Sequence, residues 1–290
     1  MGTKDLIIGG FSGYNFNQLK PWVKSICEVA DDNTDKVVVA ADASPETVKE
    51  LENHGFKVIP FNLTPSIPIH VLRFYHIHEY IKNNIEKYRF VVTTDVKDVI
   101  FQRNPFEFME RLLDRKERRI VAGSEGMYYK DEPWGNDNLM QTYGPYVHEL
   151  YKDKEIYNVG VLGGYADYIR DLIFHIFTNG INRPITICDQ AVFNVLIQST
   201  PYTDCTYLAK QYNGWACHAG TTADPSKLPS FRPFLTEKEP IFDEEKGVIK
   251  TCDGAEFYIV HQYDRVPEWK SHFMKKYGQE DASAMFTYKV

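Results

Sequence analysis

Two aspartates follow an apolar run in the first half of the chain, and their spacing is compatible with a metal site. Asp95 and Asp98 lie in the stretch "TTDVKDVIFQ", directly after "YRFVV". If Asp95 ends a strand and Asp98 closes a turn, their Cα atoms lie within about 7 Å and both carboxylates can face one cation. Such oxygen ligands favour Mg²⁺ or Mn²⁺, which leave positions for water and substrate phosphates. Acidic turns are also common in solvated loops, so the pair alone does not decide between these interpretations.

A histidine near the end of the chain extends this pattern. His261 follows the apolar run "FYIV", and Asp264 and Arg265 lie just beyond it. An imidazole that joins two carboxylates favours Mn²⁺ over Mg²⁺. The alternative is a half-buried structural histidine, which is the more common environment for any single histidine.

Two further segments place polar groups and glycines where a ligand could lie. The stretch "YNVGVLGG" contains Asn158, Gly163 and Gly164, and glycines inside a strand often mark the close approach of a ligand or another backbone. A bulge in an irregular sheet explains the same glycines equally well. The stretch "CDQ" places Asp189 and Gln190 at the start of a predicted helix, where Asp189 could instead act as the N-cap.

Arg73 and Glu125 are isolated candidates. Arg73 lies on the predicted helix that precedes "DVKD", where its guanidinium could reach a phosphate or remain solvated. Glu125, in "AGSEG", is a further acid at the end of a predicted strand. The meaning of both residues depends on the elements that position them.

The first part of the chain alternates strands and helices. Apolar runs predict strands over 4–11, 35–42, 56–61 and 89–95. Helical periodicity and caps predict helices over 16–30, 44–55 and 67–88. This alternation implies right-handed crossovers and a mostly parallel sheet with flanking helices, in which ligands bind at the carboxyl ends of strands. The loop "GGFSGYN" and the motif "DVKD" both lie at such ends.

The second part of the chain is less regular. The sequence predicts strands over 118–129, 155–164 and 255–264, helices over 165–177 and 188–199, and a loop-rich stretch from about 210 to 250. "KDEPWGNDNLMQTYGPYVHELY" mixes loop and short-helix signals. We expect a single α/β domain over 1–290, with a nucleotide-binding half over about 1–105 and a substrate-shaping half over about 106–290.

Composition excludes some classes of function. The net charge of −7 argues against nucleic-acid binding, which needs a basic surface. The five cysteines are scattered and form no CxxC pair, which is typical of reduced thiols. The start "MGTKDLIIGG" predicts a strand rather than a signal peptide, and no run approaches the roughly 18 apolar residues that span a bilayer. We therefore expect a soluble, cytoplasmic protein.

The order of these features along the chain resembles that of GT-A glycosyltransferases. A GG loop after the first strand is followed by an arginine-bearing helix, "DVKD", "YNVGVLGG", "DQAVFN" and a late strand ending in histidine. The Asp-x-x-Asp spacing resembles the sugar-transferring domain of collagen lysyl hydroxylases, which also uses a late histidine on the metal. "TDVKDVIFQRNPF" and "YNVGVLGG" are similar to capsid-glycan glycosyltransferases of large DNA algal viruses, which implies viral capsid glycosylation in the host cytoplasm.

The resemblance implies a GT-A fold and a function. A nucleotide-sugar donor, such as UDP-xylose, UDP-glucose or UDP-galactose, would give its sugar to a hydroxyl of a glycan acceptor. Mn²⁺, or alternatively Mg²⁺, would be held by Asp95, Asp98 and His261. The nucleoside would contact the loop residues Gly10, Phe11, Ser12 and Tyr14. The rest of the donor would contact Arg73, Thr94, Asn158, Gly163, Gly164, Gln190 and Arg265. Asp189 is the first candidate for the acid at the reaction centre, and Glu125 is the second.

Two other functions remain open at this point. A sugar-nucleotidylyltransferase would share the fold and the metal, but it needs a glycine loop with Arg and Lys after the first strand. "GGFSGYNFNQLKP" has the glycines and a lysine but no arginine. A non-catalytic module that only binds glycans or nucleotides is the other alternative, and the presence of both aspartates and the histidine weighs against it.

Overall fold

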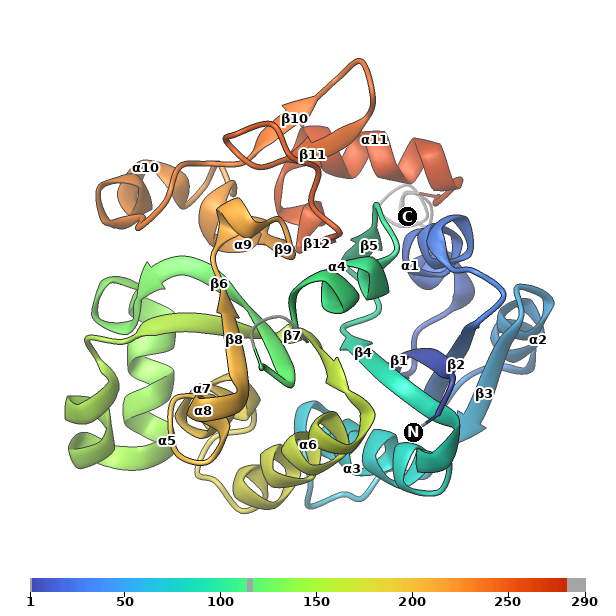
Figure 1. Ribbon diagram of the computed structural model, residues 1–290, viewed down its shortest axis with the longest axis horizontal. Helices are drawn as coiled ribbons and strands as arrows, with labels where there is room; N and C mark the ends of the chain where they lie inside the picture. The colour runs from blue at the N-terminus through green and yellow to red at the C-terminus, as the bar shows by residue number, and fades with distance from the viewer. Residues whose placement is uncertain (1, 114–116, 281–290) are drawn as a thin grey trace, which may run out of the picture.

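A large central sheet organises the molecule. The computed structural model describes residues 2–113 and 117–280, and within these ranges the strand order of this sheet is β3-β2-β1-β4-β7-β6-β8 (Figure 1). The strands are β1 (Lys4–Ser12), β2 (Thr34–Ala41), β3 (Phe56–Pro60), β4 (Tyr88–Thr94), β6 (Ile120–Tyr128), β7 (Glu155–Tyr165) and β8 (Thr206–Ala209). β7 runs antiparallel to both of its neighbours, and the other adjacent pairs are parallel. The prediction of a mostly parallel α/β sheet is confirmed.

The sheet is buried on both faces, which explains its nearly continuous apolar strands. In β1, Leu6 and Ile8 pack into one core cluster, whereas Ile7 between them packs into another. Successive side chains of a strand point to opposite faces, so each face has its own core. This arrangement leaves the ends of the strands, rather than their faces, for ligand binding.

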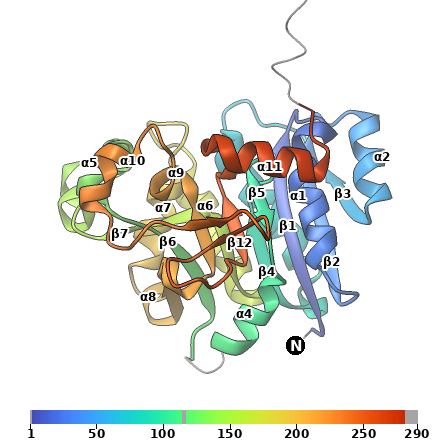
Figure 2. The same ribbon diagram turned by 90° about the horizontal axis from the view of Figure 1, so that it is seen from above.

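Helices cover both faces of the large sheet. The Ile7 face is covered by α1 (Phe16–Val29), α2 (Pro45–Asn53) and α4 (Pro105–Leu112). The Leu6 face is covered by α3 (Ile69–Lys82), α6 (Ala166–Gly180) and α7 (Asp189–Ile197). The predicted start of α2 is confirmed, because the Ser44 side chain accepts a hydrogen bond from the Thr47 backbone N–H. Figures 1 and 2 show α2 and α5 (Pro133–Tyr151) at opposite ends of the molecule.

A smaller sheet lies beside the carboxyl ends of the large one. It consists of β5 (Val99–Phe101), β12 (Ile259–His261) and β9 (Ala216–His218), with β12 in the middle, antiparallel to β5 and parallel to β9. Its core contains Ile100 and Val260 and packs against Trp269 and Phe273 of α11 (Pro267–Tyr277). The remaining elements are the hairpin β10 (Ile241–Asp243) and β11 (Val248–Lys250) and the short helices α8 (Tyr202–Cys205), α9 (Ala219–Thr222) and α10 (Leu228–Phe231).

Several elements differ from the sequence predictions: β5 and β8 were not predicted, and β9 to β11 with α9 and α10 lie in the stretch expected to be loop-rich. The strand predicted over 255–264 is limited to Ile259–His261, because only this part pairs with β5 and β9. α5, in the stretch predicted as mixed loop and short helix, consists of two shorter helical stretches that meet at Gly144, whose φ of 78° and ψ of 177° are not helical, just before Pro145. The Gly-Pro pair explains this break, because proline disfavours a helical conformation of the residue before it and glycine can adopt a positive φ. Within the described ranges, no helix is both long and apolar enough to cross a bilayer.

Candidate active site

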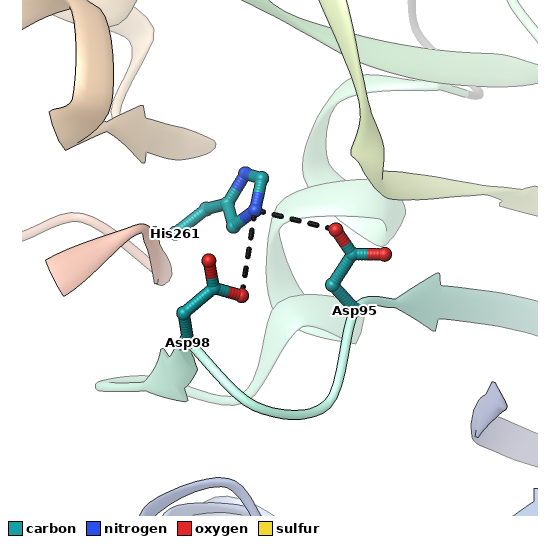
Figure 3. A group of neighbouring side chains, drawn as sticks. All are labelled: Asp95, Asp98 and His261. Atoms are coloured by element: carbon teal, nitrogen blue, oxygen red, sulfur yellow. Dashed lines mark ion pairs between the residues drawn. The ribbon is translucent and has the colours of Figure 1, made fainter. Parts of the chain in front are cut away.

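Asp95, Asp98 and His261 form a compact cluster. Each contributes one ligand atom, and these three atoms lie within 4.8 Å of one another. Figure 3 shows both carboxylates turned towards the imidazole, whose Nε2 lies 3.4 Å from Asp95 Oδ2 and 3.7 Å from Asp98 Oδ1. His261 is buried and the two aspartates are half-buried. The metal ligands implied by the sequence resemblance therefore converge on one point.

The two sheets together position this cluster. Asp95 directly follows β4 of the large sheet, and its backbone N–H donates to the Gly160 carbonyl of β7 at 2.9 Å. Asp98 directly precedes β5 of the small sheet, and its carbonyl accepts from the Gln262 N–H at 2.7 Å. His261 is brought beside Asp98 because β12 pairs with β5, with His261 opposite Val99. The loop from 95 to 98 thus joins the two sheets and holds one carboxylate on each.

The electrostatics of the cluster favour a cation. Burial raises the pKa of Asp98 and outweighs the attraction of His261. Burial also opposes ionisation of Asp95, but Arg73 and His261 hold its pKa below the usual value. For His261, burial lowers the pKa, but Asp98 and Asp95 overcome this effect and raise it. Two carboxylates in a half-buried site therefore compete for the positive charge of neighbouring groups.

The residues present fit a divalent metal ion. Two carboxylates and an imidazole are suitable donors for Mn²⁺. Gly160 leaves room beside them, since a Cβ at this position would lie 2.5 Å from His261 Cε1 and 2.8 Å from Asp95 Oδ2. Any larger residue would therefore collide with two of the three ligands. The position of Gly160 explains one of the glycines in the "YNVGVLGG" strand.

Arg73 links this cluster to a further carboxylate. Its Nη1 donates to Asp95 Oδ1, and its Nη2 donates to Asp189 Oδ2 at 3.1 Å. Burial disfavours the charge of Arg73, but Asp95 and Asp189 raise its pKa, so the guanidinium stays charged. Asp95 is therefore shared, with Oδ1 towards Arg73 and Oδ2 towards the metal cluster.

Asp189 faces the site and does not cap its helix. It is the first residue of α7, and the N-cap position is occupied by Cys188. The Asp189 side chain is buried, and this burial raises its pKa against the opposing effect of Arg73. The capping alternative considered from the sequence is therefore wrong for Asp189.

Glu125 is the centre of a buried hydrogen-bond network. Its Oε1 accepts from Asn158 Nδ2 at 2.6 Å and from Gln190 Nε2 at 2.8 Å. Its Oε2 accepts from Thr221 Oγ1 at 2.8 Å. The Asn158 amide oxygen in turn accepts from the Gly160 N–H at 2.7 Å. These contacts connect Glu125 on β6 with β7, α7 and α9 and keep the polar side chains in fixed orientations.

Two adjoining cavities surround the metal cluster. The loop cavity, of about 300 Å³, is lined by Gly10, Phe11 and Ser12 at the end of β1 and by Tyr14 in the loop that follows. The central cavity, of about 310 Å³, is lined by His261, Asn158, Asp189, Gln190 and Glu125. Both cavities share His70, Arg73, Asp95, Asp98 and Arg265. They lie where the parallel strands β1 and β4 end side by side, which is the usual ligand position in such sheets.

Three of the residues expected to contact the donor lie in the protein core instead. Thr94 Oγ1 accepts a hydrogen bond from Trp22 Nε1 at 2.9 Å. Gly163 faces Trp215, whose ring would lie 2.9 Å from an added Cβ, and Gly164 faces the backbone of Arg119. Close approach does explain both glycines, but the neighbour is protein. The other predicted donor contacts, which line one or both cavities, are Gly10, Phe11, Ser12, Tyr14, Arg73, Asn158, Gln190 and Arg265.

The sequence reasoning missed a second histidine behind the first. His218 ends β9 opposite His261 of β12, and the two Nδ1 atoms lie 3.3 Å apart with perpendicular rings. Burial and the neighbouring His261 hold the pKa of His218 well below the usual value, so its ring is neutral. The signal was present, because "WACH" is an apolar run ending in histidine, like "FYIVH". It lay in the stretch interpreted as loop.

Comparisons with known proteins agree with the fold. No profile of a known protein family matches the chain, and no curated protein sequence matches it either. Among solved structures, the bifunctional glycosyltransferase WbbM is similar over 98% of this chain, with a TM-score of 0.59 and 12% identity. This chain spans 51% of the WbbM chain, about half of its length.

A second solved structure is similar over most of both chains. Mouse xyloside xylosyltransferase 1 matches 89% of this chain and 97% of its own, with a TM-score of 0.51 and 12% identity. At this identity the similarity concerns the fold. Both structures are glycosyltransferases by name, and the similarity extends over most of this chain. The chain therefore has the GT-A fold of glycosyltransferases, as the sequence resemblance implied.

Proposed function

We propose that this protein is a metal-dependent glycosyltransferase that moves a sugar from a nucleotide-sugar donor to a hydroxyl of a glycan. The observation that carries the proposal is the position of Asp95, Asp98 and His261 between two cavities at the ends of β1 and β4. The fold supports it. We take the donor to be a UDP-sugar, with UDP-xylose, UDP-glucose and UDP-galactose as the first to test.

The loop cavity is suited to a nucleoside. Phe11 and Tyr14 stack with ring centroids 6.0 Å apart, and Lys97 Nζ lies 6.0 Å from the Tyr14 ring. Burial raises the pKa of Tyr14, so the phenol keeps its proton and can donate a hydrogen bond. An aromatic wall with a nearby cation fits a planar base linked to a diphosphate.

The metal cluster is suited to the diphosphate. Asp95, Asp98 and His261 would hold Mn²⁺, for which an imidazole ligand is favourable, or alternatively Mg²⁺. When bound, the cation supplies positive charge that stabilises the departing diphosphate. Arg73 and Arg265 line the same region and add positive charge from the protein itself.

The central cavity is suited to the sugar and to the reaction. The bond between the anomeric carbon and the diphosphate oxygen breaks, and its electron pair leaves with the nucleoside diphosphate. The acceptor oxygen forms the new bond to this carbon, and its proton passes to a carboxylate. Asp189 is our first candidate for this carboxylate, which also faces the developing positive charge of the sugar. Glu125 already accepts three hydrogen bonds, so we assign it to positioning Asn158 and Gln190 against sugar hydroxyls.

Thermal unfolding in the presence of UDP tests the proposal. UDP with Mn²⁺ should raise Tm, and UDP with EDTA should not. UDP release from a panel of UDP-sugars then shows turnover. An identical Tm under all conditions would contradict nucleotide binding, and a metal-dependent shift without release from any donor would indicate a binding module. Pyrophosphate formed from UTP and a sugar 1-phosphate would instead indicate a nucleotidylyltransferase.

A further inference from the structure

A third cavity continues the row formed by the first two. This outer cavity, of about 180 Å³, is lined by Asp137, Asn138, Gln141, Thr186 and neighbouring residues. It shares Trp134 and Ile187 with the central cavity. We call these two side chains the ridge, because the central cavity lies on one side of them and the outer cavity on the other. A ligand that leaves the reaction centre in this direction has to cross the ridge.

The ridge exposes apolar surface of a kind that proteins usually bury. Trp134 is 50% exposed and Ile187 is 42% exposed. The other three tryptophans of the chain, Trp22, Trp215 and Trp269, are buried. An exposed aromatic ring inside a polar cleft is a good surface for the apolar C–H face of a sugar ring, because stacking removes both surfaces from water.

The backbone holds the ridge in place. Trp134 lies in the first turn of α5, where the Glu132 side chain caps the helix by accepting from the Gly135 N–H. Asn138, one turn further along α5, donates a side-chain hydrogen bond to the Ile187 carbonyl. The ridge therefore combines α5 and the segment before α7 into one surface. Such a surface loses little conformational entropy when a ligand binds.

The outer cavity offers hydrogen bonds without positive charge. Asp137 and Gln141 lie one helical turn apart on α5, and the Gln141 amide donates to the Asp137 carboxylate. Their free oxygen atoms and Thr186 can bond sugar hydroxyls. Among the described residues that line this cavity, none is basic. This lining suits a neutral saccharide better than a sulfated, phosphorylated or carboxylated one.

We infer that the acceptor is a neutral oligosaccharide of at least two sugar rings, and that its second ring stacks on Trp134. This inference rests on the proposed function, since it places the reacting hydroxyl in the central cavity. The terminal ring lies beside Asp189 and Gln190, and the rest of the saccharide crosses the ridge towards Asp137 and Gln141. A single monosaccharide would not reach both cavities, so acceptor length becomes a determinant of specificity.

Tryptophan fluorescence tests the ridge without any need for turnover. Acrylamide should quench mainly Trp134, and Trp134→Phe should remove this quenchable signal. With UDP and Mn²⁺ present, the probes are neutral trisaccharides of glucose, galactose, mannose or xylose, their monosaccharides, and trigalacturonic acid. At least one neutral trisaccharide should protect Trp134 more than its monosaccharide does. The inference is overturned if no neutral trisaccharide protects the ring, or if monosaccharides or trigalacturonic acid protect it equally.

Transfer kinetics provide the second test. With a protecting trisaccharide as acceptor, Trp134→Ala should raise the acceptor KM by about tenfold, equivalent to a loss of about 1.4 kcal/mol. Tyr146→Ala is the matched control, because Tyr146 is a 77% exposed aromatic of the same helix that lines none of the three cavities. An equal acceptor KM in parent and Trp134→Ala protein would overturn the inference. Absence of UDP release from the parent protein would instead contradict the proposed function. The fluorescence test does not depend on UDP release, so the two failures can be distinguished.

Discussion

At the scale of single residues, the two carboxylate oxygens of Asp95 have different partners. One oxygen is bonded to Arg73 and the other faces His261. Asp98 lies 3.7 Å from the same histidine, and Arg265 acts on it through its charge. The two aspartates of the "DVKD" motif are therefore unequal, although the sequence presents them as a pair. Their substitutions should have different consequences.

Asp98→Ala should abolish Mn²⁺-dependent UDP binding and leave the fold intact. The Asp98 carboxylate carries a raised pKa through burial, so its removal costs the folded protein little. Isothermal titration with UDP and Mn²⁺ measures binding, and circular dichroism checks the fold. His261→Ala should weaken binding less, because two carboxylates and the diphosphate remain. Asp153→Asn, at an exposed carboxylate paired with Lys130, is the control and should bind like the parent. Parental UDP turnover by Asp98→Ala with Mn²⁺ would refute the metal assignment.

Arg73→Met should destabilise the metal-free protein at neutral pH by about 3 kcal/mol, because the buried Asp189 and the half-buried Asp95 lose their partner. Urea unfolding in EDTA measures the effect, and the control Arg232→Met, at an exposed ion pair, should destabilise the protein far less. Arg73 lowers the pKa of Asp95, so the stabilisation is present above the unfolded pKa of about 3.9 and is lost as pH falls towards the lower folded value. The difference in the free energy of unfolding between the parent and Arg73→Met should therefore become smaller below about pH 4. A constant difference from pH 7 to pH 3 would contradict this account.

His218→Gln should weaken Mn²⁺ binding without unfolding the protein. The neutral His218 ring lies 3.3 Å from His261 Nδ1 and can fix the tautomer that leaves Nε2 free for the metal. Loss of such a partner typically costs about tenfold in metal affinity. Electron paramagnetic resonance of free Mn²⁺ measures this directly, and it does not depend on turnover. Unchanged affinity would show that His218 only fills space behind His261.

At the scale of elements, the site exists because two sheets meet at the loop between β4 and β5. The large sheet provides Asp95 and the small sheet provides Asp98 and His261. β7 lies under this junction, since its Gly160 carbonyl accepts from the Asp95 N–H. On β7, Gly160 lies against the metal cluster, whereas Gly163 lies against Trp215 in the core. Substitutions at these two positions can therefore separate metal binding from stability.

Gly160→Ala should reduce Mn²⁺-dependent UDP binding, because its Cβ would collide with His261 and Asp95. Gly163→Ala, on the same strand, should lower Tm through its collision with Trp215 but retain the metal-dependent response to UDP. Thermal unfolding with and without UDP and Mn²⁺ separates the two effects. Equal loss of the UDP response in both variants would mean that β7 acts only as a scaffold.

The sequence predicted six of the seven strands of the large sheet, all but the short β8, because the evidence for them is local. Long apolar runs, caps such as Ser44 and the carboxyl-end positions of "GGFSGYN" and "DVKD" can each be recognised within one segment. The small sheet could not be predicted in this way, because its strands are only three residues long and β12 pairs with strands far away in the sequence, β5 at 99–101 and β9 at 216–218. His261 was found because its strand follows a longer apolar run. His218 was missed because its strand lies between loops. Glycine alone also could not show that Gly163 and Gly164 approach protein rather than ligand.

At the scale of the whole molecule, three cavities run in series from the ends of β1 and β4 to the N-terminal turn of α5. Residues from both halves of the chain line the central cavity, including Arg73 before position 105 and Gln190 after it. A donor bound there would contact both halves at once. Binding should therefore affect the two sheets together.

UDP with Mn²⁺ should slow amide hydrogen exchange in both sheets, at 95–101 and at 259–262, as well as in the loop after β1. The reason is that the cation would join ligands from the two sheets, so that local opening of either one costs the binding energy. Hydrogen-exchange mass spectrometry measures this, with UDP and EDTA as the control. Protection confined to residues 9–15 would show that the nucleotide binds without the metal cluster.

The contacts of Arg73 also determine what the metal does for the protein. Its guanidinium donates hydrogen bonds to both Asp95 and Asp189 and offsets part of their negative charge, and His261 lies beside the second oxygen of Asp95. These side chains act as internal counter-ions that keep the acidic groups in place before any metal arrives. The ion would then enter a preassembled coordination shell with little reorganisation. The metal would then be required for binding of the donor but not for folding, so removal of the ion would leave the protein folded and able to bind the metal again.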